Sequence, residues 1–154
     1  DWDTPDLDAW TASIDAEVFS ARRPVVLVAH SFGCLAAACS IERNADRIAG
    51  ALLVAPADPD KFGLASRLPS QRLECRSVLI GSTNDPWLAS QSAYRLAQRW
   101  GSRFIELASA GHINADSGFG AWPEGRLLLD AVLRESLRTA HASRHDGRSY
   151  AQAK

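Results

Sequence analysis

A serine, an aspartate and a histidine suited to chemistry follow one another along the chain as Ser31, Asp85 and His112. A serine hydroxyl is too weakly acidic to attack a carbonyl unaided, so a neutral imidazole must take its proton. The imidazole in turn needs a carboxylate on its other nitrogen, which fixes its tautomer and stabilises the imidazolium. These residue types therefore predict nucleophilic catalysis, with Ser31 as the nucleophile, His112 as the base and Asp85 as the acid that orients it.

Ser31 lies at a predicted turn between a strand and a helix. The run Val25–Val28 is apolar and mostly β-branched, which is typical of a buried strand, and residues of high helix propensity follow the turn. Ala29 and Gly33 stand two places to either side of Ser31, where larger side chains would clash with the neighbouring backbone. The pattern resembles the nucleophile elbow of the α/β-hydrolases, and it predicts that the Phe32 backbone N–H binds an oxyanion.

Two aspartates are candidates for the acid. Asp85 precedes Pro86, which disfavours helical backbone angles at the aspartate and holds it extended at the end of a predicted strand. Asp58 also precedes a proline, one strand earlier in the chain, and is the alternative. Asp85 is favoured because its strand should neighbour the strand that leads to His112.

Three further residues are candidates for contact with substrate. His30 precedes Ser31 in the strand, so its side chain should point away from the serine, and we interpret it as a pocket wall or packing residue. Trp87 lies beside the acid, and Trp122 lies after the histidine loop. Packing is the alternative role for each of the three.

Strand-like and helix-like segments alternate along the sequence. Expected strands cover 25–28, 48–54, 77–81 and 103–107, and a helical pattern precedes or follows most of them. Such alternation implies parallel strands whose carboxyl ends carry the ligand site. The expected fold class is α/β, a three-layer α/β/α sandwich with a mostly parallel sheet. Residues 1–138 should form one domain, and 139–154 a polar, disordered tail.

Composition excludes several classes of protein. The 154 residues carry a formal net charge of −1, which gives no general attraction to nucleic acid or anionic membranes. No apolar run approaches the roughly 20 residues that span a bilayer. The three cysteines are odd in number and lack metal-ligand spacing. They predict reduced thiols in a cytoplasmic protein.

A set of short segments forms a more specific pattern. The segments are Trp2–Pro5, Leu27–Cys34, Asn84–Pro86, Gly111–Ala115, Ser117–Gly120 and Trp122–Pro123. Together they resemble the small serine hydrolases similar to retinoblastoma-binding protein 9 and bacterial YdeN, over about residues 1 to 135. The resemblance implies an α/β-hydrolase core, a triad at Ser31, Asp85 and His112, and no metal or organic cofactor. The expected function is hydrolysis of small ester or amide substrates through an acyl-enzyme.

The resemblance also implies a difference at the amino end. Members of that family begin with a further strand and a glycine-containing loop before the Trp-Asp-x-Pro region, which here lies at 2–5. The sequence has no methionine. We therefore expect the first strand and the second oxyanion donor to be missing, and this chain to be weakly active or inactive alone. The alternative function is a catalytically silent interaction module with an unknown protein partner.

Overall fold

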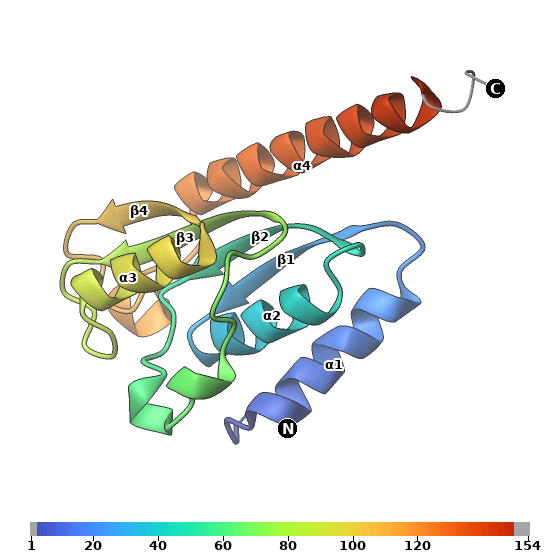
Figure 1. Ribbon diagram of the computed structural model, residues 1–154. Helices are drawn as coiled ribbons and strands as arrows, with labels where there is room; N and C mark the ends of the chain where they lie inside the picture. Colours follow the sequence, from blue (N-terminus) through green and yellow to red (C-terminus); the bar gives the residue numbers. More distant parts are fainter. Residues whose placement is uncertain (1–2, 150–154) are drawn as a thin grey trace.

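Four parallel strands form the centre of the protein. The computed structural model describes residues 3–149, except for the side chains of 137 and 139–149. The strands are β1 (Val25–His30), β2 (Ile48–Val54), β3 (Arg76–Ser82) and β4 (Arg103–Leu107), and they lie in the order β1-β2-β3-β4 (Figure 1). All three neighbouring pairs are parallel, which confirms the predicted α/β class.

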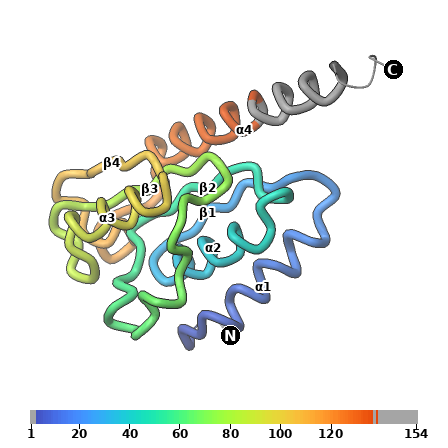
Figure 2. The backbone as a smooth tube through the Cα atoms, in the orientation of Figure 1, coloured from blue at the N-terminus to red at the C-terminus, as the bar shows by residue number. Residues whose placement is uncertain are grey.

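Helices cover both faces of this sheet. On one face lie α1 (Leu7–Ser20), α2 (Phe32–Arg43) and α3 (Ser90–Trp100), with α1 alongside α2 (Figures 1 and 2). The long helix α4 (Pro123–Ser149) crosses the other face. The predicted three-layer α/β/α arrangement is therefore confirmed.

Each face of the sheet has its own apolar core. Along β2, Ala51 and Leu53 belong to the core shared with α1–α3, and Leu52 and Val54 belong to the core under α4. Successive side chains of a strand point to opposite faces, so an unbroken apolar strand serves both layers. This burial on both faces explains why the strands read as continuous apolar runs.

The structure differs from the sequence prediction after residue 138. A disordered tail was expected over 139–154, whereas α4 continues to Ser149. The sequence here is rich in alanine and arginine and lacks proline, so local helix propensity extends the helix beyond its apolar face. Residues 150–154 of the expected tail lie outside the described residues.

Among the described residues, four other than glycine have positive φ, and all follow strand ends. They are Ser31 (φ 54°), Ala55 (φ 44°), Ser109 (φ 52°) and Ile113 (φ 51°). Ser31 and Ala55 directly follow β1 and β2, and the other two lie in the loop after β4. Left-handed backbone costs a residue with a side chain about 1 kcal/mol or more. Backbone strain is thus concentrated at the carboxyl edge of the sheet.

The strand β1 lies at one edge of the described sheet. It pairs only with β2, and the side chain of Val28 is 58% exposed. The Ser31 N–H donates to the Val54 carbonyl at 3.0 Å. Because successive N–H groups of a strand point in opposite directions, the N–H groups of Val28 and His30 face away from β2. One side of β1 therefore lacks a strand partner within residues 3–149.

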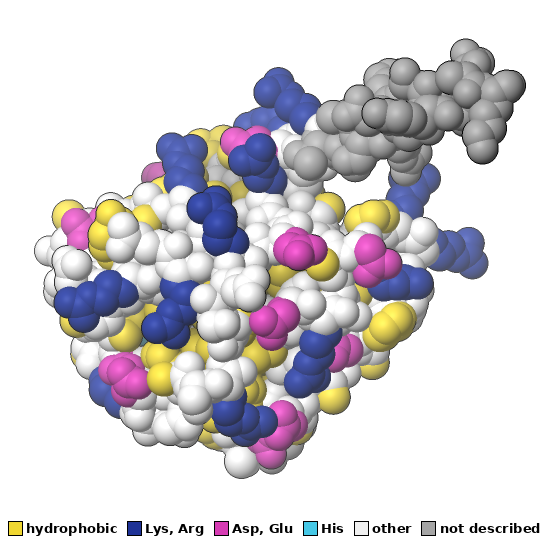
Figure 3. Space-filling model, in the orientation of Figure 1, with side chains coloured by type: hydrophobic (Ala, Val, Ile, Leu, Met, Phe, Trp, Pro, Cys, Tyr) yellow, Lys and Arg dark blue, Asp and Glu magenta, His cyan; other side chains and the backbone are white. Residues whose placement is uncertain are grey.

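The surface carries mixed charge. Figure 3 shows acidic and basic side chains interspersed over one face of the molecule. Within the part of the chain that the structure describes, no helix has the length and apolarity needed to cross a bilayer.

Gly50 of β2 allows α4 to approach the sheet closely. A Cβ at this position would collide with Ser136 Oγ and lie 3.0 Å from Val132 Cγ1. We expect Gly50→Ala to lower the free energy of unfolding by about 1–3 kcal/mol, measured by urea denaturation. Gly120→Ala is the matched control, because nothing lies within 4 Å of its added Cβ. Equal stability of the two variants would contradict this account of the packing.

Candidate active site

Ser31 stands on a sharp turn between β1 and α2. Its backbone has φ 54° and ψ −127°, which lies outside the strand and helix regions. The Ser31 N–H still bonds to β2 through the Val54 carbonyl, and α2 begins at the next residue. The turn therefore presents the Ser31 hydroxyl beyond the carboxyl end of the sheet, as the local sequence predicts.

A chain of hydrogen bonds joins Ser31 to His112 and Asp85. The Ser31 Oγ lies 2.9 Å from His112 Nε2, and His112 Nδ1 lies 3.0 Å and 3.1 Å from the two carboxylate oxygens of Asp85. The side chains of His112 and Asp85 are only 9% and 2% exposed. Because a carboxylate only accepts, the neutral imidazole donates from Nδ1 and accepts the Ser31 hydroxyl proton at Nε2.

The two aspartates weighed from the sequence occupy different positions. Asp85 Oδ1 also accepts the Trp87 N–H at 2.9 Å, which fixes the carboxylate against His112. Asp58 Oδ1 instead accepts the Asp60 N–H at 3.0 Å, at the start of a short 3₁₀ turn (Asp60–Phe62). The geometry thus brings Asp85, and not Asp58, to the histidine.

Side chains at the end of β3 hold the loop that carries His112. Ser82 Oγ accepts the Ala110 N–H at 3.0 Å, and Asn84 Oδ1 accepts the Gly111 N–H at 2.7 Å. Ser82 also donates to Asn84 at 2.9 Å, so the two acceptors form one hydrogen-bonded network. Sequence reasoning did not give Ser82 or Asn84 a role. The sequence feature that could have indicated them is the run of polar residues at the end of β3, directly before Asp85.

The Phe32 backbone occupies the first position of α2. The first N–H groups of a helix have no acceptor within the helix, and the helix dipole makes this end favourable for negative charge. The Phe32 ring is buried between Trp10 and Phe62, each with its ring centroid 5.0 Å away. This packing anchors the N–H group expected to bind an oxyanion.

Among the three candidate substrate contacts, His30 is exposed and Trp122 is half-buried. The third, Trp87, is also an exposed ring beside His112. It is 58% exposed, and its centroid lies 6.2 Å from that of His112. Lys61 donates to the Trp87 carbonyl at 2.6 Å, which ties this loop to the segment after β2. Trp122 packs edge-on against Phe119, at 5.6 Å between centroids. It also lines an apolar groove of about 360 Å³ next to His30.

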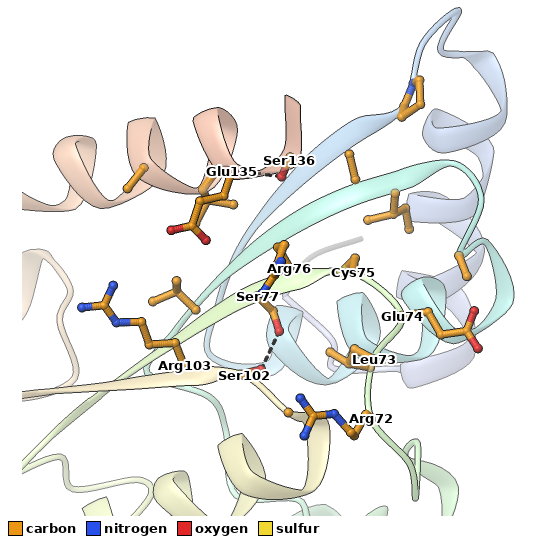
Figure 4. A pocket seen from close by; sticks show the side chains of 18 of the residues that line it. Arg72, Leu73, Glu74, Cys75, Arg76, Ser77, Ser102, Arg103, Glu135 and Ser136 are labelled. Carbon is orange, nitrogen blue, oxygen red and sulfur yellow. Dashed lines mark hydrogen bonds between the residues drawn. The ribbon is translucent and has the colours of Figure 1, made fainter. Parts of the chain in front are cut away.

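A larger hollow lies at the opposite end of the sheet. It has a volume of about 700 Å³ and is lined by the first residues of three strands, namely Ile48, Arg76 and Arg103, and by α4 (Figure 4). Ser31, Asp85 and His112 are not among the residues that line it. Parallel strands start at one edge and end at the other, so this hollow is separated from Ser31 by the length of the sheet.

The three cysteines are buried or half-buried. Cys34, Cys39 and Cys75 are all free thiols. Burial raises the pKa of each thiol, that of Cys75 to about 11. Among the described residues, no three His, Cys, Asp or Glu side chains lie together as potential metal ligands.

Comparisons with known proteins place the chain among hydrolases. A family model described as serine hydrolase matches residues 1–131. The chain is 37% identical to a YdeN-like hydrolase from Pectobacterium atrosepticum (TM-score 0.75), covering 85% of this chain and 68% of that one. A search of curated proteins found no match.

Two more distant structures share the fold. The ydeN gene product of B. subtilis is 21% identical (TM-score 0.69), with coverage of 84% of this chain and 76% of that one. A monoacylglycerol lipase from Paleococcus ferrophilus is 14% identical (TM-score 0.64), with coverage of 83% and 75%.

Proposed function

Because this chain belongs to the serine hydrolase family, we propose that it hydrolyses small esters or amides through an acyl-enzyme on Ser31. One observation carries the proposal: the hydrogen-bonded chain from the Ser31 hydroxyl through His112 to the buried Asp85 carboxylate. In this arrangement the base lies within reach of the nucleophile's proton, and the acid fixes the base's tautomer.

The first half of the reaction acylates Ser31. The Ser31 oxygen attacks the substrate carbonyl carbon while His112 Nε2 takes the hydroxyl proton. The Asp85 carboxylate stabilises the imidazolium that results, and the Phe32 N–H donates to the oxyanion. As the carbonyl reforms, the bond to the leaving group breaks, and His112 returns its proton to the departing alcohol or amine.

The second half releases the acid. A water molecule gives a proton to His112 Nε2 as its oxygen attacks the acyl carbon, and Ser31 leaves with the proton that His112 then returns. The same residues thus serve twice, with His112 alternating between base and acid. The exposed ring of Trp87 offers an apolar surface for the acyl or leaving group beside the reacting centre. Reduced thiols at all three cysteines fit a cytoplasmic location.

A fluorophosphonate probe tests the proposal directly. We expect the protein to be labelled covalently at Ser31, with one label per chain, and Ser31→Ala to abolish the labelling. Pretreatment with iodoacetamide at neutral pH should leave labelling unchanged, because the raised thiol pKa values keep the cysteines protonated. Peptide mass spectrometry locates the label. A folded, full-length protein that takes no label would instead favour the interaction module.

A further inference from the structure

Side chains hold the peptide groups on both sides of His112. Its N–H donates to Ser117 Oγ at 3.0 Å, and the preceding Gly111 N–H donates to Asn84. The His112 carbonyl accepts a bond from His30 Nε2 at 2.8 Å. The backbone of the proposed base is thus fixed from three directions, and the bond from His30 alone comes from the strand that carries the nucleophile.

We propose that His30 is a positioning residue, which sets His112 against Ser31 by donating a hydrogen bond to the His112 carbonyl. The proposal rests on the function proposed above. A carbonyl oxygen only accepts, so His30 Nε2 must carry the hydrogen. Because that hydrogen is present in both the neutral Nε2–H tautomer and the imidazolium, the bond does not depend on the charge of His30.

The bond from His30 couples the position of His112 to that of Ser31 because of where His30 lies in the chain. His30 is the last residue of β1 and is directly bonded to Ser31, so its backbone moves with the nucleophile. Its ring also meets the His112 ring nearly edge to face, with 4.7 Å between centroids and 64° between planes. The bond fixes where the His112 backbone lies, and the ring contact restricts how its imidazole turns.

The strained residue after His112 shows why a fixed carbonyl matters. Ile113 has φ 51°, a conformation that a β-branched side chain rarely adopts. Without a partner for the His112 carbonyl, only the Ile113 N–H, which donates to the Ala110 carbonyl at 3.1 Å, would hold the peptide between the two residues. The peptide could then rotate more easily and relieve this strain. Such a rotation would carry the imidazole away from its 2.9 Å contact with Ser31. Misplacement by about 1 Å can cost roughly 10²-fold in rate.

Two substitutions separate the hydrogen bond from the ring. His30→Leu removes the donor, and we expect it to lower kcat for a short-chain ester by about 10²-fold with little change in KM. In His30→Gln the side-chain amide can place an N–H near the position of Nε2, so it should recover most of the lost kcat. Val28→Thr is the matched control, because it alters the same face of β1 two residues away, and it should leave kcat unchanged.

Nitrogen-15 NMR of the imidazole rings gives a readout that needs no activity. In the wild-type protein His112 should be in the Nδ1–H tautomer, bonded to Asp85, and neutral His30 in the Nε2–H tautomer. In His30→Leu the His112 signals should move toward the average of the two tautomers, and in His30→Gln they should not. A full-length natural protein without hydrolase activity would defeat the proposed function, while these spectra still test the positioning.

Several results would overturn the proposal. Wild-type kcat and His112 signals in His30→Leu would mean that the bond is unnecessary. Equal losses in the leucine and glutamine variants would mean that the N–H donor is not what matters. A raised KM with kcat retained would make His30 a substrate contact. Thermal unfolding of each variant identifies a loss of activity that comes from unfolding. If the leucine variant does not fold, the His112 spectrum of the folded glutamine variant tests the proposal, and shifted His112 signals there would contradict it.

Discussion

Replacing Ser31 with alanine is expected to lower kcat by about 10⁴- to 10⁶-fold, since no other group in the site can form the acyl intermediate. His112→Ala should cost a similar factor, because the hydroxyl then has no base within 2.9 Å. The double variant should be little worse than either single one, since residues that act as a unit lose their effect together. Hydrolysis of a short-chain p-nitrophenyl ester by the full-length natural protein and its variants, corrected for the uncatalysed reaction, measures all three.

The single and double variants must also keep their fold. Ser31→Ala removes only one oxygen, so its unfolding midpoint should stay close to that of the wild type. A His112→Ala variant with near-normal turnover would show that another group is the base. Activity lost in His30→Ala but retained in His112→Ala would identify His30 as that group.

Asp85→Asn is expected to lower kcat by about 10⁴-fold while leaving the site's geometry nearly intact. The asparagine amide can donate to His112 Nδ1, which would stabilise the wrong tautomer and place a hydrogen on Nε2, where the Ser31 proton must go. The neutral amide also cannot stabilise the imidazolium. The ester assay measures the loss, and an imidazole nitrogen spectrum can detect the change of tautomer.

Asp58→Asn is the matched control for this substitution. Its side chain accepts one backbone N–H in a turn, at 3.0 Å, and an asparagine oxygen can keep that bond. We therefore expect activity and stability close to those of the wild type. A larger loss in Asp58→Asn than in Asp85→Asn would move the acid to the loop after β2.

Much of the fold could be predicted because local sequence and global topology agree. The strand β2 was predicted with its observed bounds, Ile48–Val54, since apolar residues on both faces of a parallel strand leave an unbroken run. The order of Ser31, Asp85 and His112 at the ends of the first, third and fourth strands predicted one site, and the structure brings the three side chains together. Their catalytic roles stay predictions.

The rest depended on contacts that no local pattern encodes. The bond from His30 to the His112 carbonyl joins residues 82 positions apart. It requires both the end of β1 and the conformation of the loop after β4. Side chains of adjacent residues in a strand point to opposite faces, which predicts that His30 points away from Ser31. This rule does not predict which residue the His30 side chain contacts. The prediction of a disordered tail from residue 139 was wrong for a different reason. The helix α4 continues to Ser149 because its residues have high helix propensity, although they show no apolar pattern.

The strained residues at strand ends bear on how such a protein can evolve or be engineered. Ser31, Ala55, Ser109 and Ile113 hold unfavourable backbone angles at the edge that carries the site. Glycine at Ala55 or Ser109 would relax the backbone but would also loosen the turn, so gains in heat resistance there would cost preorganisation. Elsewhere in the part of the chain that the structure describes, no residue other than glycine has a positive φ. Substitutions that raise thermostability can therefore be selected in the helices and strands away from the carboxyl edge of the sheet. Substitutions that change substrate preference can arise at that edge, where the strained residues lie.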